Sequence, residues 1–156
     1  MVGLPGSGKD TIVNILSEDF GFNVIRVEEI FKIETKKDIC DLVKNNGFQN
    51  VGKMERRILN RFEKTRGKII IGCGITTDFS SNNFLIIYLK CPKDKFIEKF
   101  KKCGSKNSLE NHYNTFHKYY SLQADLVIST EHKMKFEIAA IINDFYKKNI
   151  LHNQNT

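Results

Sequence analysis

The sequence predicts an α/β fold in which helices cover both faces of a parallel sheet. Short apolar runs alternate along the chain with longer amphipathic patterns, the order typical of strands and helices in such folds. The runs at 68–72 and 84–89 are continuously apolar, as strands buried on both faces of a parallel sheet are. With 156 residues, 40% of them hydrophobic, the chain can build one proper core. We therefore expect one domain over 1–148 and a polar, frayed tail at 149–156.

The first element is a short strand followed by a glycine-rich loop. Only Met1 and Val2 precede Gly3, whereas a central strand normally has about five residues. We expect either a first strand reduced to a stub or a natural start that lies upstream. After the loop, Ile12, Ile15 and Leu16 share one face of a helix.

The remaining elements alternate along the chain. Strands are predicted at 22–27, 68–72, 84–89 and 125–129, and helices at 28–45, 50–65, 92–102, 109–122 and 134–147. Ligands of parallel sheets bind beyond the carboxyl ends of the strands. The loop after the first strand, the turn Gly72-Cys73-Gly74 and the segment after Leu89 should therefore meet at one cleft.

The loop from Gly3 to Lys9 fits the first seven positions of the phosphate-binding pattern G-x-x-x-x-G-K-[ST]. Its glycines let backbone N–H groups turn toward an anion at a helix N-terminus, and the lysine reaches the terminal phosphates. We predict Lys9 as the catalytic residue. The expected contacts to nucleotide phosphates are Gly3, Gly6, Ser7, Gly8, Lys9, Asp10 and Thr11.

The eighth position of the pattern departs from the rule, because Asp10 replaces the usual Ser or Thr and Thr11 follows it. A hydroxyl at this place normally ligates Mg²⁺, and a carboxylate near a triphosphate is repelled unless the metal lies between them. Asp10 and Thr11 are therefore candidate metal ligands. In the alternative interpretation, Asp10 only complements the dipole of the helix that begins there.

Charge and cysteine content narrow the possible functions. The net charge of +7 comes from lysines spread over several helices without an RNA-binding signature, so we expect anionic small-molecule substrates rather than nucleic acid. Cys40, Cys73, Cys91 and Cys103 form no C-x-x-C pair, which predicts reduced thiols and neither a zinc site nor disulfides. No apolar stretch approaches the ~20 residues of a membrane span, and no signal peptide is present. We expect a cytoplasmic monomer.

Several segments beyond the loop resemble the shikimate kinase family, one of the small P-loop kinases that also include nucleoside monophosphate kinases. The matching segments are Ile39–Gly47, Glu55, Gly72-Cys73-Gly74, Cys91-Pro92 and Tyr120–Asp125. The resemblance implies a P-loop kinase fold with about five parallel strands, a truncated first strand and a small lid over 101–109. It also implies an ATP- and Mg²⁺-dependent kinase that transfers the γ-phosphoryl group to a small hydroxylated acceptor, with shikimate as the family default.

The acceptor side of this resemblance is altered. The three polar positions that hold shikimate in the family correspond here to Ile30, Gly52 and Phe116. The lid arginine is also absent. On this comparison, the candidate acceptor residues are Gly72, Cys73, Gly74, Glu28 and Arg57, and the candidate lid residues are Lys101, Lys102 and Lys106.

Two other functions remain open from the residues. Pro5, the pair Asp10-Thr11 and the G-x-G turn also occur in nucleoside monophosphate kinases of the cytidylate or deoxynucleotide type. The stubbed first strand and the altered acceptor positions favour a noncatalytic nucleotide-binding protein. The acceptor assays described below separate these alternatives.

Overall fold

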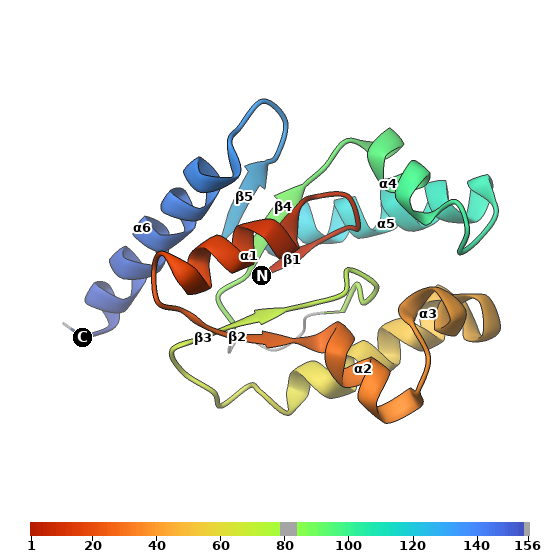
Figure 1. Cartoon of the computed structure of the whole chain (residues 1–156), viewed down its shortest axis with the longest axis horizontal. Helices are drawn as coiled ribbons and strands as arrows, with labels where there is room; N and C mark the ends of the chain where they lie inside the picture. The colour runs from red at the N-terminus through yellow and green to blue at the C-terminus, as the bar shows by residue number, and fades with distance from the viewer. Residues whose placement is uncertain (79–83, 155–156) are drawn as a thin grey trace.

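The fold was obtained as a computed structural model that describes residues 1–78 and 84–154, with side chains as far as residue 149 (Figure 1). Its described strands are all parallel: β1 (Val2–Gly3), β2 (Asn23–Arg26), β3 (Lys68–Ile71), β4 (Ile87–Lys90) and β5 (Leu126–Ser129). They form a three-stranded ladder in the order β1-β4-β5 and a two-stranded ladder of β2 and β3. The predicted strands are thus present, but in two ladders.

Met1 connects the two ladders. Its amino group donates to the carbonyl of Ile70 over 2.7 Å, and the N–H of Gly72 donates to the Met1 carbonyl over 3.1 Å. These two bonds place β1 between β3 and β4, so the spatial order across the sheet is β2-β3-β1-β4-β5. The sheet divides here because β1 has two residues, as the short run before Gly3 predicts.

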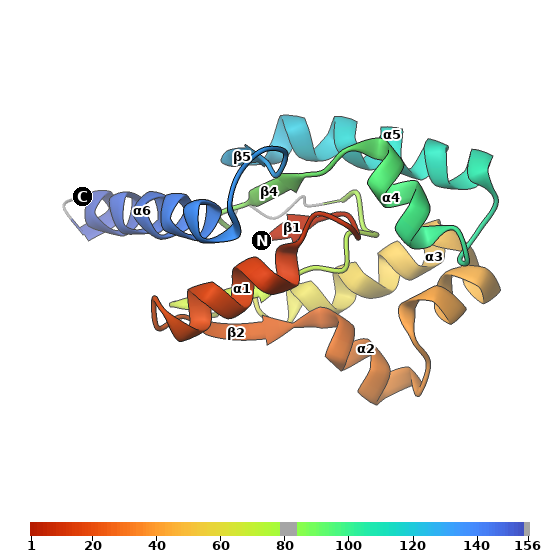
Figure 2. The ribbon, with the colours of Figure 1, turned by 45° about the horizontal axis from the view of Figure 1, so that its top comes forward.

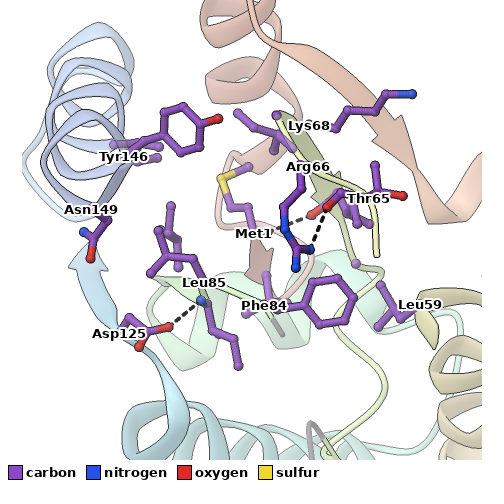
Figure 3. A pocket seen from close by; sticks show the side chains of 18 residues that line it. Met1, Leu59, Thr65, Arg66, Lys68, Phe84, Leu85, Asp125, Tyr146 and Asn149 are labelled. Carbon is purple, nitrogen blue, oxygen red and sulfur yellow. Dashed lines mark hydrogen bonds between the residues drawn. The ribbon is translucent and has the colours of Figure 1, made fainter. Parts of the chain in front are cut away.

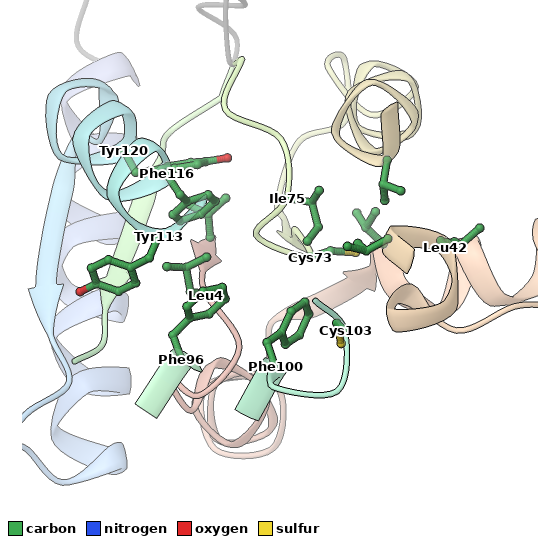
Figure 4. Packing of buried hydrophobic residues seen from close by; sticks show 14 of the residues in the cluster. Leu4, Leu42, Cys73, Ile75, Phe96, Phe100, Cys103, Tyr113, Phe116 and Tyr120 are labelled. Carbon is green, nitrogen blue, oxygen red and sulfur yellow. The ribbon is translucent and has the colours of Figure 1, made fainter. Parts of the chain in front are cut away.

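Alternate residues of β4 face two separate apolar clusters, one on each side of the sheet. Ile86 and Tyr88 belong to a cluster with α2 (Val27–Thr35), α3 (Ile39–Asn60), α4 (Lys93–Phe100) and α5 (Lys106–Gln123). Figure 4 shows Leu4, Phe96 and Phe116 in this cluster. Ile87 and Leu89 face α1 (Lys9–Glu18) and α6 (Lys135–Gln154), which lie side by side (Figures 1 and 2). Helices therefore cover both faces, as predicted.

Three helix boundaries differ from the predicted ones. The helix expected at 28–45 breaks after α2, because Lys36 adopts a left-handed conformation with φ 58° and Asp38 starts a new helix by accepting from the N–H of Asp41 over 2.8 Å. The new helix continues through a kink at Gly47, where φ is 75° and ψ is 159°. α6 extends to Gln154, so the first residues of the expected tail are helical.

The prediction of four reduced thiols is wrong for one pair. Cys40 at the start of α3 forms a disulfide with Cys103, which follows α4, and their Cα atoms are 5.0 Å apart. Cys73 and Cys91 are free and buried. The two bridged residues are 63 positions apart in the sequence, so no local spacing rule could pair them. The bridge ties the predicted lid region to the helix that follows α2.

Within the described part of the chain, no helix is both long and apolar enough to cross a membrane.

Candidate nucleotide and acceptor site

The loop between β1 and α1 has the geometry of an anion-binding nest. Gly6 and Gly8 adopt positive φ angles of 94° and 77°, and the N–H of Ser7 donates to the Leu4 carbonyl over 3.0 Å. Ser7 is fully buried, and its hydroxyl has no hydrogen-bond partner among the described residues. Lys9 begins α1 and is only 7% exposed. An unpaired buried hydroxyl beside a buried lysine fits an absent anion, as the loop pattern predicts.

The turn Gly72-Cys73-Gly74 packs directly on this loop. A Cβ at Gly74 would lie 2.7 Å from the carbonyl oxygen of Gly3, and φ of Gly74 is 80°. Only glycine permits this approach. The expected meeting of the two glycine-rich segments at the carboxyl ends of the strands is therefore observed.

Glu55 of α3 holds that turn from the other side. Its buried carboxylate accepts from the N–H groups of Cys73, Ile75 and Thr76 over 2.6, 3.0 and 2.7 Å. Burial raises the pKa of the Glu55 carboxyl, and the backbone donors oppose that rise. The sequence comparison marked Glu55 without indicating this task, because a long-range contact between a side chain and a distant turn leaves no local signal.

A pocket of about 390 Å³ opens beside the loop lysine. It is lined by Lys9, Asp10, Asn14, Arg26, Glu28, Glu29, Lys32, Ile71 and Gly72. Of the predicted acceptor residues, the pocket includes Glu28 and Gly72. Arg57 is exposed on α3 and contributes to neither pocket described in this section, and the same is true of the expected lid residues Lys101, Lys102 and Lys106.

Arg26, at the end of β2, is the polar residue that organises this pocket. Its guanidinium donates to Asp10 over 3.0 Å and to Asn14 over 2.6 Å, and it lies 3.7 Å from a carboxylate oxygen of Glu29. Asp10 therefore has a partner that neither sequence interpretation included. Its carboxylate remains 67% exposed, so it is accessible to a metal ion.

The described residues include no group of three or more His, Cys, Asp or Glu side chains arranged to hold a metal. The few protein ligands on the page are Asp10 and Thr11, both exposed in the first turn of α1. Such a donor set suits Mg²⁺, which keeps most of its waters and takes further oxygens from substrate phosphates.

His112 of α5 supports the same turn through the aromatic core. Its Nε2 lies 3.1 Å from the Gly74 carbonyl, and its ring stacks on Phe48 with centroids 4.0 Å apart. Burial lowers the pKa of His112 to about 4, so the ring is neutral and donates to that carbonyl. The aromatic seam expected on this helix is thus observed, with the histidine bonded to the G-x-G turn.

A second cavity, of about 480 Å³, opens at the opposite ends of the strands (Figure 3). Phe84, Arg66 and Tyr146 surround it, together with Met1. Burial lowers the pKa of the Met1 amino group to about 5. This cavity is separated from the loop by the length of β1.

The comparisons with known proteins agree with this geometry. The family pattern described as shikimate kinase matches residues 5–147, which is most of the chain. The protein belongs to the shikimate kinase family. It is similar to the shikimate kinase of Persephonella marina, with 26% identity over 150 residues that cover 88% of this chain and 92% of that protein. The shikimate kinase of Dehalococcoides mccartyi is also 26% identical, with 95% and 92% covered.

Solved structures show the same fold. Shikimate kinase from Acinetobacter baumannii in complex with shikimate aligns with a TM-score of 0.74 at 18% identity, covering 95% of this chain and 91% of that one. Shikimate kinase from Aquifex aeolicus aligns with a TM-score of 0.72 at 22% identity, covering 96% of both. A deoxyadenosine kinase from M. mycoides aligns with a lower TM-score of 0.55 at 19% identity, covering 94% of this chain and all of the other. The P-loop kinase fold and a small-molecule kinase activity follow from the family.

Proposed function

We propose that this shikimate kinase family member transfers the γ-phosphoryl group of ATP to a hydroxyl of a small acceptor bound in the pocket beside Lys9. The single observation that carries the proposal is the placement of Lys9 between the phosphate loop and that pocket. Phosphoryl transfer depends mostly on positioning and charge neutralisation, which a buried lysine and loop N–H groups supply. Mg²⁺, held by Asp10 or Thr11, neutralises phosphate charge when it is bound.

The acceptor pocket supports a default substrate with altered recognition. Phe116 is fully buried, and a Cβ at Gly52 would lie 3.3 Å from the Ile75 carbonyl, so an arginine has no room there without a shift of the turn. These positions therefore offer no charged contact to a shikimate carboxylate. Arg26 and Lys32 line the pocket and are the cations available to an anionic acceptor. Shikimate remains the acceptor to test first.

The test is ADP release in a coupled assay, with shikimate and with CMP, UMP, dCMP and AMP as alternative acceptors. Turnover with shikimate, abolished in Lys9→Met, supports the proposal. Turnover with a nucleotide alone would instead place the chain with the nucleoside monophosphate kinases. Tight ATP binding with no turnover for any acceptor would favour the noncatalytic alternative.

A further inference from the structure

Lys135, the first residue of α6, reaches across to the phosphate loop. A Cβ at Gly8 would lie 2.8 Å from its Cε and even closer to its Nζ. The ammonium therefore covers the Cα of Gly8, the glycine that directly precedes Lys9. A second lysine, far away in the sequence, thus stands at the loop, although it belongs to no part of the phosphate-binding pattern.

The packing of α6 explains this direction. Ile138, Ala139 and Ile142 lie in the apolar cluster with Ile12 and Leu16 of α1. Positions three, four and seven residues after Lys135 occupy the same helix face as Lys135 itself. Because that face is fixed against α1 (Figures 1 and 2), the lysine stem is directed toward the start of α1.

The charge of Lys135 is not compensated by a protein partner within the described residues. None of the ion pairs found there includes Lys135 or Lys9, although Lys135 is half-buried and Lys9 is buried. Two partly desolvated ammonium groups at one loop repel each other, and an anion between them relieves that repulsion.

The geometry points to Lys135 as a nucleotide-binding residue that contacts the phosphates common to ADP and ATP. Lys9 extends toward the terminal phosphates and the acceptor pocket, whereas Lys135 approaches Gly8 from the α6 side. Its contact should therefore be retained when the γ-phosphate is removed. This inference rests on nucleotide binding at the loop and not on the identity of the acceptor.

The experiment measures ADP and ATP affinity by titration calorimetry for the full chain, Lys135→Met, Lys135→Arg and Lys133→Met. Methionine keeps the length of the apolar stem, and Lys133 is an exposed lysine two residues away that serves as the control. We expect Lys135→Met to weaken both nucleotides by about tenfold to a hundredfold, as for a lost charge-assisted hydrogen bond. Lys135→Arg should restore most of the affinity, and Lys133→Met should change neither.

Three results would overturn the inference: equal affinities for the full chain and Lys135→Met, a loss in Lys133→Met as large as in Lys135→Met, or a loss confined to ATP. Melting temperatures of all variants show whether α6 remains packed. If nucleotide affinity depends on Lys135 while no acceptor is phosphorylated, the inference holds and the proposed function fails.

Discussion

Nη1 of Arg26 lies 3.0 Å from Oδ1 of Asp10, so the residue at the eighth position of the phosphate loop pattern is ion-paired with the end of β2. The pair connects the first turn of α1 to the acceptor pocket. Its side chains are 27% and 67% exposed, so solvent screens the interaction and its contribution to folding is small.

The first prediction concerns the stability of this pair. A double-mutant cycle with Asp10→Ala and Arg26→Met should give a coupling free energy below about 1 kcal/mol, decreasing as salt is added. Urea denaturation at two ionic strengths measures it. A coupling of several kcal/mol that persists in high salt would show that the pair is structural.

The second prediction tests the metal role of Asp10. If the carboxylate ligates Mg²⁺, Asp10→Ala should raise the Mg²⁺ concentration for half-maximal phosphoryl transfer by about tenfold, whereas Asp10→Ser should leave it nearly unchanged. Arg26→Met should shift it in the opposite direction, because it releases Asp10 from its partner. Identical Mg²⁺ dependence in all three variants would leave only the ion pair and helix dipole as functions of Asp10.

The third prediction concerns Glu55 and the turn it holds. Glu55→Gln keeps the volume but replaces one accepting oxygen by a donor, which leaves buried N–H groups of the turn without a partner. We expect a loss of about 2 kcal/mol in the free energy of unfolding. Glu98→Gln, on the exposed face of α4, is the matched control and should be neutral. A neutral Glu55→Gln would contradict the assigned role.

The fourth prediction concerns the bridge between Cys40 and Cys103. Closing a loop over 63 positions constrains the unfolded chain by about 4 kcal/mol in the chain-entropy model. Reductant should therefore lower the melting temperature of the oxidised protein but not that of Cys103→Ser. Thiol titration of the unfolded, unreduced protein should find two free thiols, Cys73 and Cys91. Four titratable thiols after mild oxidation would show that the pair does not close.

The fifth prediction is an acid-dependent loss of stability. The pKa of His112 is about 4 in the fold and near 6.5 when exposed, so the unfolded chain binds the extra proton between these values. The free energy of unfolding should therefore fall as pH drops from 6.5 to 4, by roughly 3 kcal/mol from this residue. His112→Gln keeps a donor for the Gly74 carbonyl but does not titrate. The difference between the two proteins, followed by thermal melts, should favour the variant increasingly below pH 6.5.

The sequence alone determined the alternation of parallel strands and helices, the phosphate loop and the short first strand, because each is expressed in neighbouring residues. Apolar periodicity over 68–72 and 84–89 and the glycine spacing from Gly3 to Lys9 are local patterns. The break at Lys36 was missed, since a left-handed residue other than glycine has no clear local signature.

Only the tertiary structure decided which distant side chains meet at the loop. The partnership of Arg26 with Asp10, the hold of Glu55 on the G-x-G turn, the bridge from Cys40 to Cys103 and the reach of Lys135 to Gly8 all join residues from separate elements. Such contacts depend on how helices pack against a sheet, and packing is set by the summed burial of many residues rather than by any short stretch of the sequence.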